Sequence, residues 1–303
     1  MRIVVFGAGS LGSALGALLA RKNEVILVGR RANVLAIQSS GLNVIGDASF
    51  KVRVEAHESA EGLEPPELLI MSTKSYDTLS AIDACRGFVG KDAMVLTLQN
   101  GLGNLEALRK WRGRLAFGGT TTMGANLVSP GKVRVSGLGR TIIGSDRDPP
   151  GARMIARAFS ESGLPSSVRS AIQGEIWAKA VISSCINPLT AILRVPNGML
   201  LESPAIYRML ADVCRESESV ARSSGIRLPY SSMVARVRAV AKDTRNNRSS
   251  MLRDIERGKR TEIAYINGAL VRHGLSKKVR TPLNLTLLAM VESLEATVTP
   301  EKA

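Results

Sequence analysis

The chain has 303 residues, which is long enough for two domains of ordinary size. Hydrophobic residues make up 45% and charged residues 22% of it, a globular mix that excludes wholesale disorder and collagen-like structure. Its three cysteines form no C-x-x-C pair and it has only two histidines, so we expect no metal site and a reduced intracellular compartment.

The formal net charge of +15 raises the question of nucleic-acid binding. Much of the excess lies in an arginine-rich stretch between Arg227 and Arg260. Aromatic residues make up only 4% of the chain and do not interleave with this stretch as base-stacking platforms would. We therefore disfavour nucleic acid as a partner. Two interpretations remain: a solvated helix face, or attraction of an anionic cofactor and substrate.

The first apolar run, residues 3–6, is interrupted at once by glycines, whereas a signal peptide needs an unbroken apolar segment. No stretch of the sequence approaches the roughly 20 apolar residues that a membrane helix requires. The sequence therefore predicts a cytoplasmic protein with no membrane partner. A homodimer is an alternative to a monomer that the sequence leaves open.

The first half of the chain alternates short apolar strands with helical segments. The expected strands are residues 3–6, 24–28, 68–72 and 93–98. Residues 11–20 form an expected helix, and the alternation predicts a parallel sheet with right-handed crossovers. Between residues 115 and 144, dense glycines and short apolar runs indicate edge strands and hairpins that complete the sheet.

The second half becomes helical after a Pro/Gly/Asp-rich loop at residues 146–151. The expected helices are residues 153–162, 170–186, 205–224, 230–241, 261–273 and 284–295. The second of them should stop at Pro188, because a proline inside a helix removes a hydrogen bond. The predicted fold class is α/β: a Rossmann-type dinucleotide-binding domain over residues 1–167, then an all-α domain over residues 168–303.

A glycine-rich pattern, G-x-G-x-x-G, follows the first strand and opens the first helix. It consists of Gly7, Ala8, Gly9, Ser10, Leu11 and Gly12. The first glycine permits a tight turn, the second lets the backbone approach a pyrophosphate, and the third lets helix and strand pack closely. The pyrophosphate would bind the free N–H groups of the helix. A glycine-rich turn that binds nothing is the alternative, but the context favours a dinucleotide.

The end of the second strand indicates which dinucleotide is bound. Val28-Gly29-Arg30-Arg31 contains no carboxylate, whereas an NAD site usually places one there for the ribose 2′-hydroxyl. A guanidinium matches a phosphate bidentately, so the sequence predicts NADP(H) with Arg30 at the 2′-phosphate. An exposed arginine pair is the alternative.

Two polar clusters follow the later strands: Ser72-Thr73-Lys74 and Gln99-Asn100-Gly101. Ligands of open α/β sheets bind beyond the carboxyl ends of the strands, so both clusters are candidates for the nicotinamide end of the cofactor. A solvated surface lysine is the alternative for Lys74.

Lys179, Ser183 and Asn187 are spaced i, i+4 and i+8, which places them on one face of a helix. Their neighbours are apolar, which predicts a mostly buried helix. Burial would lower the pKa of Lys179 toward the range useful for proton transfer. A lysine that extends from the helix edge into water is the alternative.

With these motifs, the sequence resembles the ketopantoate reductase (2-dehydropantoate 2-reductase) family over nearly the whole chain. The matching pieces, besides the glycine pattern, are Thr73-Lys74, Gln99-Asn100-Gly101, Ile176-Trp177-Ala178-Lys179, Asn187-Pro188-Leu189-Thr190-Ala191, Pro196-Asn197-Gly198, Ser249-Ser250-Met251-Leu252-Arg253-Asp254-Ile255, Thr261-Glu262-Ile263 and Tyr265-Ile266-Asn267-Gly268. The resemblance implies a helical domain of the 6-phosphogluconate dehydrogenase-like type. It also implies NADPH-dependent reduction of ketopantoate to pantoate, a step toward pantothenate and coenzyme A.

The resemblance also implies residue roles. Lys179 matches the catalytic lysine that protonates the carbonyl oxygen, and Glu262 matches the acid that holds the substrate hydroxyl. The other implied substrate-binding residues are Asn100, Ser183, Asn187, Asn197 and Ser250. The implied cofactor-binding residues outside the glycine pattern are Arg30, Lys74 and Asn100.

Two positions depart from the family pattern. Ser183 stands where an asparagine is typical, and Ala264 where an acidic residue is common. A serine reaches less far than an asparagine, so the substrate contacts are open to rearrangement. Another 2-keto acid is therefore an alternative substrate. A non-catalytic NADP-sensing protein that binds nucleic acid is the alternative from another class, and retention of both Lys179 and Glu262 argues against it.

Overall fold

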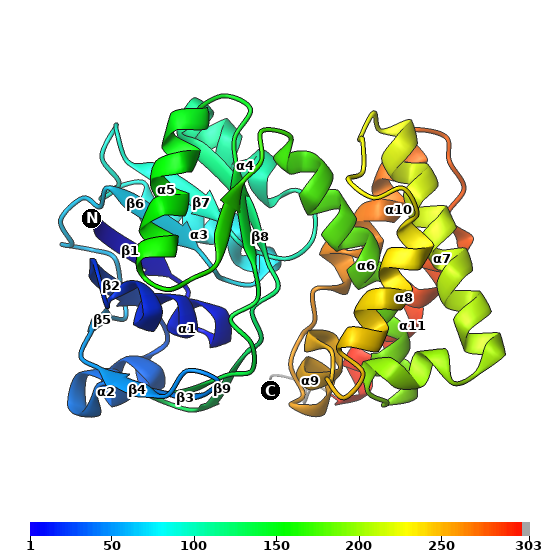
Figure 1. The fold of residues 1–303 in the computed structure, drawn as a ribbon, viewed down its shortest axis with the longest axis horizontal. Coiled ribbons are helices and arrows are strands. Elements are labelled where there is room, and N and C mark those ends of the chain that lie inside the picture. Colours follow the sequence, from blue (N-terminus) through cyan, green and yellow to red (C-terminus); the bar gives the residue numbers. More distant parts are fainter. Residues whose placement is uncertain (299–303) are drawn as a thin grey trace. The chain divides into compact units, whose positions relative to one another are not determined.

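The computed structural model describes residues 1–298, which divide into two compact units. The sheet unit comprises Met1–Gln99 and Asn104–Ile172, and the helical unit comprises Asn100–Gly103 and the residues from Gln173 onward. Figure 1 shows the sheet unit in blue to green and the helical unit in green to red. The expected domain boundary, between residues 167 and 168, falls inside a strand of the sheet unit, Ser166–Val168 (β12).

Within the described residues, an eight-stranded sheet organises the sheet unit, in the order β12-β11-β8-β7-β6-β1-β2-β5. The other strands are β1 (Arg2–Phe6), β2 (Glu24–Val28), β5 (Glu55–His57), β6 (Leu68–Met71), β7 (Met94–Thr97), β8 (Ala116–Thr121) and β11 (Thr141–Gly144). Every neighbouring pair is parallel except β8 with β11. The strand order reverses at β1, which is the switch point where doubly wound sheets bind ligands.

Helices cover both faces of this sheet. They are α1 (Ser10–Leu19), α2 (Arg31–Ser40), α3 (Thr78–Cys85), α4 (Asn104–Arg112) and α5 (Pro149–Glu161), with 3-10 turns η1 (Ser75–Asp77) and η2 (Gly113–Leu115). Side chains of α1 and α5 share one core cluster with alternate residues of the central strands, such as Ile3 and Val5. In Figure 1, α1 and α5 lie in front of the sheet, and α3 and α4 lie behind it. The central strands are buried on both faces, as their continuous apolar runs require. The expected α/β class is confirmed.

A second, four-stranded sheet was not predicted from the sequence. Its order is β4 (Phe50–Val52), β3 (Leu42–Gly46), β10 (Lys132–Val135) and β9 (Ala125–Ser129). Helix α1 contacts β3, β9 and β10 as well as β1 and β2 of the large sheet. The prediction that residues 115–144 complete the large sheet is therefore correct for β8 and β11 and wrong for β9 and β10.

The helical unit contains the remaining helices of the described chain. They are α6 (Ile172–Leu193), α7 (Pro204–Ser223), α8 (Met233–Asp243), α9 (Ser250–Glu256), α10 (Asn267–Ser276) and α11 (Pro282–Val298), with 3-10 turns η3 (Asn197–Leu201) and η4 (Ile263–Tyr265). The side chains of Ser203, Ser232 and Ser249 accept hydrogen bonds from the first turns of α7, α8 and α9. Such caps satisfy N–H groups that have no acceptor within the helix. The cap at Ser232 starts α8 at Met233, three residues later than expected.

The prediction that α6 stops at Pro188 is wrong. The helix continues to Leu193 with Pro188 inside it. Because proline has no N–H group, the carbonyl oxygen of Ser184 loses its usual helical donor. The buried side chain of Asn267 supplies a replacement, because its Nδ2 donates to that oxygen at 3.1 Å. A side chain from another helix thus stabilises a helix that continues through a proline, where the local rule predicts an end.

Other helices also differ from expectation. Helix α5 begins at Pro149 and not at Arg153, because the Asp148 carboxylate accepts the N–H of Gly151 at 3.0 Å and prolines fit a first turn. The expected helix over residues 261–273 is instead η4, a break at Ile266 and then α10. Helix α9 was not predicted.

Helix α6 is, among residues 1–298, the one helix long and apolar enough by composition to cross a membrane, contrary to the expectation from the sequence. In the structure 61% of its most apolar window is buried inside the protein. Its residues Val181, Cys185 and Ile186 form a core cluster with side chains of α7 and α8. Its apolar composition is accounted for by this packing.

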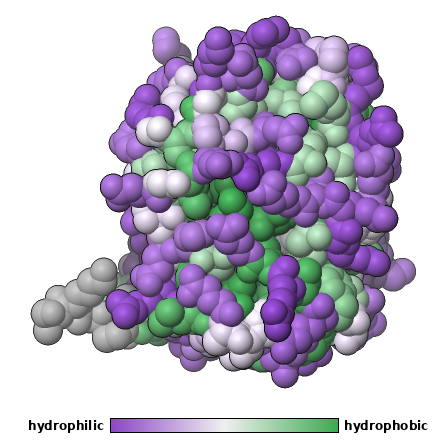
Figure 2. All heavy atoms as spheres, turned by 90° about the vertical axis from the view of Figure 1, so that its left-hand side faces the viewer, coloured by the Kyte–Doolittle hydropathy of each residue, from purple (hydrophilic) through white to green (hydrophobic). Residues whose placement is uncertain are grey.

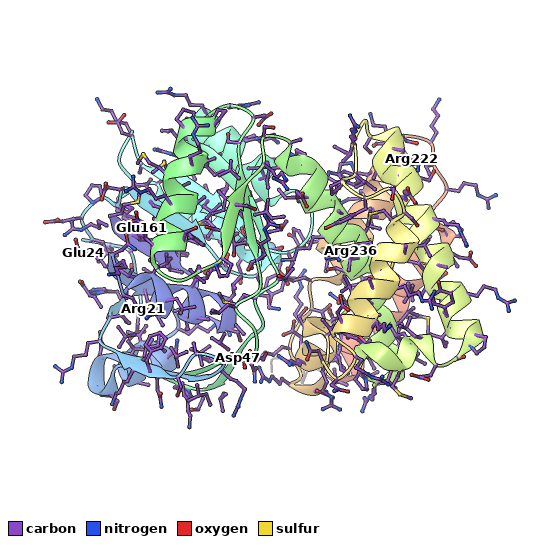
Figure 3. All side chains as sticks on the ribbon, in the orientation of Figure 1. Arg21, Glu24, Asp47, Glu161, Arg222 and Arg236 are labelled. Atoms are coloured by element: carbon purple, nitrogen blue, oxygen red, sulfur yellow. The ribbon has the colours of Figure 1, made fainter. Side chains whose placement is uncertain are left out.

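The surface carries the charge that the composition indicates. The face seen in Figure 2 is mostly hydrophilic, with hydrophobic atoms visible between the polar side chains near its centre. Figure 3 shows charged side chains around both units, Arg222 and Arg236 among them. The guanidinium of Arg236 lies 5.1 Å from the ring centre of Tyr230, and that of Arg238 lies 5.8 Å from Tyr207. These basic residues of α8 therefore pack over aromatic rings of the protein itself.

Candidate active site

The glycine turn after β1 has the geometry that dinucleotide binding requires. Gly7 has φ +108°, and a Cβ atom there would lie 2.6 Å from the backbone N of Thr73. A Cβ at Gly12 would lie 2.2 Å from the carbonyl oxygen of Gly7. The middle glycine, Gly9, is exposed and a Cβ there would meet nothing closer than 3.9 Å. Gly7 and Gly12 must be glycines because a side chain there would collide with the protein's own backbone. Gly9 has no such neighbour, and the absence of a side chain leaves its backbone open to a ligand.

The N-terminus of α1 offers unused hydrogen-bond donors to an anion. The helix begins at Ser10 with no side-chain cap, so its first N–H groups have no acceptor within the helix. The hydroxyl oxygen of Ser10 accepts a hydrogen bond from the N–H of Leu127 at 2.9 Å, which leaves its O–H free to donate. These donors fit a pyrophosphate.

Arg30 lies between the end of β2 and the first turn of α2. Strand β2 ends at Val28. Arg30 occupies the N-cap position of α2 with an extended backbone, and Arg31 is the first helical residue. Both arginines are exposed, and within the described chain neither forms an ion pair with a carboxylate. Both guanidinium groups are therefore available to an anionic ligand.

The polar clusters after β6 and β7 are joined by Gln99, which the sequence placed in the second cluster without indicating this structural link. Its Nε2 donates to the carbonyl and hydroxyl oxygens of Thr73, each at 3.1 Å, and to the hydroxyl of Thr78 at 2.8 Å. The hydroxyl of Ser72 donates to the carbonyl oxygen of Gly7 at 3.0 Å. Lys74, half-buried at the start of η1, therefore lies on a segment tied to the glycine turn.

Helix α6 presents Lys179, Ser183 and Asn187 at half-buried positions of one face, while the neighbouring Ala180 and Val181 are buried. Desolvation lowers the pKa of the Lys179 ammonium to about 8, and the Glu262 carboxylate opposes this by favouring the charged form. The direction is the one expected from the sequence. A lysine with this pKa exchanges a proton readily near neutral pH.

Asn100 and Glu262 are held together in the helical unit. The Nδ2 of Asn100 donates to Oε2 of Glu262 at 3.2 Å, and the N–H of Leu102 donates to the carbonyl oxygen of Tyr265 at 2.9 Å. Gly101 has φ +79°, and a Cβ there would lie 2.5 Å from that same carbonyl oxygen. Glu262 is only 5% exposed. The structure thus brings together Asn100, Lys179 and Glu262, which the sequence singled out separately.

Thr190 of α6 joins the segment of Asn187 to Ser249. The hydroxyl of Thr190 lies 2.9 Å from the carbonyl oxygen of Asn187 and 2.8 Å from the hydroxyl of Ser249, the residue before Ser250. The local sequence pattern does not indicate this link, because Thr190 and Ser249 lie 59 residues apart.

Asn197 is attached to the segment that precedes α9. Its Nδ2 donates to the hydroxyl of Thr244 at 2.9 Å, and its N–H donates to the carbonyl oxygen of Asn247 at 2.9 Å. Its Oδ1 is buried and has no partner among residues 1–298. Ser250 is exposed at the first position of α9. Both side chains have hydrogen-bonding capacity left for a ligand.

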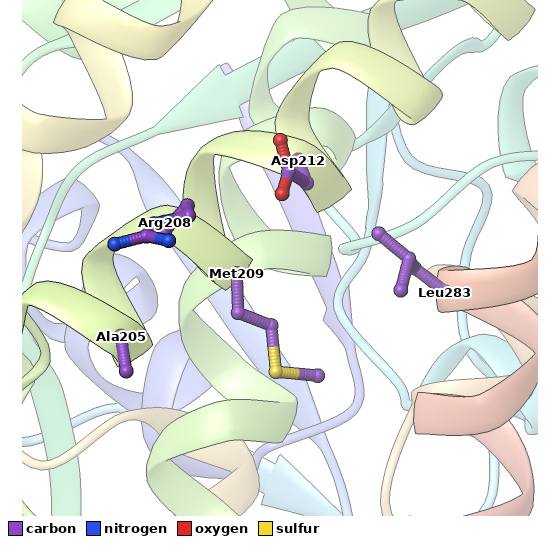
Figure 4. A pocket seen from close by; sticks show the side chains of 5 residues that line it. All are labelled: Ala205, Arg208, Met209, Asp212 and Leu283. Carbon is purple, nitrogen blue, oxygen red and sulfur yellow. The ribbon is translucent and has the colours of Figure 1, made fainter.

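A shallow cavity of about 310 Å³ lies elsewhere in the helical unit, beside α7 and the start of α11 (Figure 4). It is lined by Ala205, Arg208, Met209, Asp212 and Leu283. It contains none of the predicted site residues.

Comparison with known proteins identifies relatives over the full chain. The family model described as ketopantoate reductase PanE/ApbA matches residues 3–148, and the model of the C-terminal part of the same family matches residues 171–295. The 2-dehydropantoate 2-reductase of Pyrococcus horikoshii is 38% identical over 301 residues, which cover 98% of each chain. That of Archaeoglobus fulgidus is 36% identical and covers 97% of this chain and 98% of the relative.

Solved structures share the fold. A PanE/ApbA family ketopantoate reductase from Ralstonia eutropha has a TM-score of 0.92 at 31% identity, covering 98% of this chain and 99% of the other. D-mandelate dehydrogenase in a ternary complex with NADH and anilino(oxo)acetate has a TM-score of 0.93 at 29% identity, with the same coverage.

Proposed function

The chain belongs to the ketopantoate reductase family, and on that premise we propose that it catalyses the NADPH-dependent reduction of 2-dehydropantoate to pantoate. The observation that carries the proposal is the grouping of Lys179, Glu262 and Asn100, a proton donor of lowered pKa beside a buried carboxylate and an amide. We assign cofactor binding mainly to residues 1–167 and substrate binding to residues 168–303.

The cofactor is NADP(H), and the residues described above fit it. The turn from Gly7 to Gly12 would hold the pyrophosphate and Arg30 the 2′-phosphate, with Lys74 and Asn100 at the nicotinamide end. When bound, the cofactor supplies the hydride. The protein's own contribution is orientation, a proton and charge stabilisation.

In this proposal Lys179 donates a proton to the oxygen of the substrate's keto group as that oxygen gains negative charge. Glu262 accepts a hydrogen bond from the substrate's hydroxyl, and its charge keeps Lys179 protonated over a wider range of pH. Asn187, Asn197, Ser183 and Ser250 orient the substrate with neutral donors and acceptors. Burial around the lysine strengthens these interactions, because fewer water molecules compete for them.

A second candidate is the reduction of another 2-keto acid. Two observations favour it: the likeness to D-mandelate dehydrogenase, and the short Ser183 side chain at a half-buried position of α6. A shorter side chain leaves room for a water molecule or for a bulkier substrate.

One assay separates these candidates. Purified protein is mixed with NADPH and each member of a panel of 2-keto acids, and the loss of NADPH absorbance is followed. We expect 2-dehydropantoate to give the highest kcat/KM, with NADPH preferred over NADH. A higher kcat/KM for an aromatic 2-keto acid would favour the second candidate, and no turnover of any member would contradict both.

We expect Arg30→Ala to weaken NADPH binding by about 1.5–3 kcal/mol, because one charge-assisted contact to the 2′-phosphate is lost. NADH has no such phosphate, so its affinity should change little. Calorimetric titration of both cofactors into wild type and variant measures the difference. Equal losses for NADPH and NADH would show that Arg30 does not bind the 2′-phosphate.

A further inference from the structure

Asn33 is a buried amide in the first turn of α2, two residues after Arg31. Its Nδ2 donates to the carbonyl oxygen of Ala8 at 2.8 Å and to the hydroxyl of Ser13 at 3.3 Å. Its Oδ1 accepts the backbone N–H of Gly131 at 2.8 Å. One side chain therefore joins the glycine turn, the first part of α1 and the turn between β9 and β10.

The bond to Ala8 fixes the orientation of the glycine turn. The N–H of Ala8 donates to the carbonyl oxygen of Val28 at 2.8 Å, and its carbonyl oxygen accepts from Asn33 and, at 3.2 Å, from the Ser13 hydroxyl. That carbonyl shares a peptide plane with the N–H of Gly9. Fixing the plane sets the direction in which the chain enters α1, and so the direction of the first N–H groups of that helix.

The bond to Gly131 fixes the position of α2. Gly131 has φ +71°, and a Cβ atom there would lie 3.1 Å from the Cβ of Ala36 in α2. The carbonyl oxygen of Gly131 accepts the N–H of Asn43 in β3 at 2.8 Å. The turn is therefore packed against α2 and anchored to the second sheet, and Asn33 connects both to the glycine turn.

These two anchored elements carry the two anion sites that the proposed function assigns to the cofactor. The first N–H groups of α1 would bind its pyrophosphate, and Arg30 at the start of α2 would bind its 2′-phosphate. The covalent structure of NADP sets the distance between its phosphates, so the two sites bind it together only at a matching separation. Sites held in advance at that separation lose less freedom when the ligand binds.

We propose that Asn33 is a positioning residue for NADP(H), which holds the glycine turn and the start of α2 at the separation that one dinucleotide spans. Both N–H groups and the carbonyl oxygen of its amide are used within the protein, so it acts through these segments and not by touching the cofactor. The proposal rests on the proposed function only through the cofactor. Its test is therefore a binding measurement that needs no substrate.

The first measurement is the dissociation constant of NADPH and of NADH for Asn33→Ala. We expect NADPH binding to weaken about tenfold or more and NADH binding to weaken less, so that the preference for NADPH falls. Asn23→Ala is the matched control. Asn23 also bonds two acceptors, the carbonyl oxygen of Leu19 and the hydroxyl of Ser162, but at the other end of α1. The control should lose stability without losing affinity for either cofactor.

The second measurement combines Asn33→Ala with Arg30→Ala. If Asn33 sets the position of Arg30, removing Arg30 should weaken NADPH binding at least about threefold less in the Asn33→Ala background than in the wild type. For NADH the two changes should be additive. Equal effects of Arg30→Ala on NADPH in both backgrounds, or affinities of Asn33→Ala that match those of Asn23→Ala, would overturn the proposal.

Asn33→Ser serves if the alanine variant does not fold. The single hydroxyl of serine adds no charge and can keep one hydrogen bond, but it cannot join Ala8, Ser13 and Gly131 as the amide does. This variant should show the same loss of NADPH preference. Wild-type affinity for both cofactors in this variant would overturn the proposal equally.

Discussion

Lys179→Ala is expected to lower kcat by about 10² to 10⁴, which is the usual contribution of a general acid. The expectation rests on a half-buried lysine whose pKa is lowered to about 8 and whose face of α6 also carries Ser183 and Asn187. Single-turnover reduction by bound NADPH measures the effect on the chemical step without interference from product release.

The affinity for NADPH is the control for this variant, and it should change far less than kcat. Residual activity should reflect the bound geometry alone. A variant with near-normal kcat would assign the proton to another group, and Lys74 is the first candidate because its segment is tied to the glycine turn.

The same lysine predicts how the reaction depends on pH. A proton donor must be protonated when the substrate binds, so kcat/KM for reduction should be level below pH 8 and fall about tenfold per unit above it. The Glu262 carboxylate raises the pKa of Lys179 against the effect of burial. Glu262→Gln should therefore move the falling limb to lower pH. An unmoved limb in this variant would mean that the titrating group is not Lys179.

The parts of the fold that could be predicted are those in which local pattern and tertiary structure agree. Strands β1, β2, β6 and β7 are buried on both faces, so they are continuous apolar runs in the sequence. The second sheet has no such signal. Its strands β3 and β4 are partly exposed, and β3 pairs with β10, about 90 residues away, so neither composition nor neighbourhood indicates the pairing.

Local rules failed where a distant side chain replaces a lost hydrogen bond. The rule that proline ends a helix is correct for the isolated segment, but it does not include Asn267, which lies 83 residues from the carbonyl group that it satisfies. The features of the candidate site also divide into those that a local pattern indicates and those that depend on distant segments. The lowered pKa of Lys179 followed from apolar neighbours within one helix, whereas the roles of Gln99, Thr190 and Asn33 depend on segments that meet only in the folded chain.

Substrate discrimination is the other large effect that we expect, and it depends on Glu262. This carboxylate is 5% exposed and already accepts a hydrogen bond from Asn100, and we propose that it also accepts one from the substrate's hydroxyl. A 2-keto acid of the same branched skeleton without the 4-hydroxyl would leave that acceptor position unfilled. Sites built to bond a hydroxyl reject such analogues by about 10⁴ to 10⁵ in kcat/KM.

The comparison of wild type with Glu262→Gln measures how much the charge of Glu262 contributes to this discrimination between the two keto acids. The amide oxygen of glutamine still accepts a hydrogen bond but carries no charge, so a missing hydroxyl costs it less than it costs a carboxylate. The ratio of kcat/KM for 2-dehydropantoate to that for the analogue should therefore be smaller in the variant. Water beside the short Ser183 side chain would reduce the ratio in both proteins, because it can donate in place of the hydroxyl. Equal efficiency of the wild type on both acids would contradict the assignment of 2-dehydropantoate and favour a reductase of broader 2-keto-acid specificity.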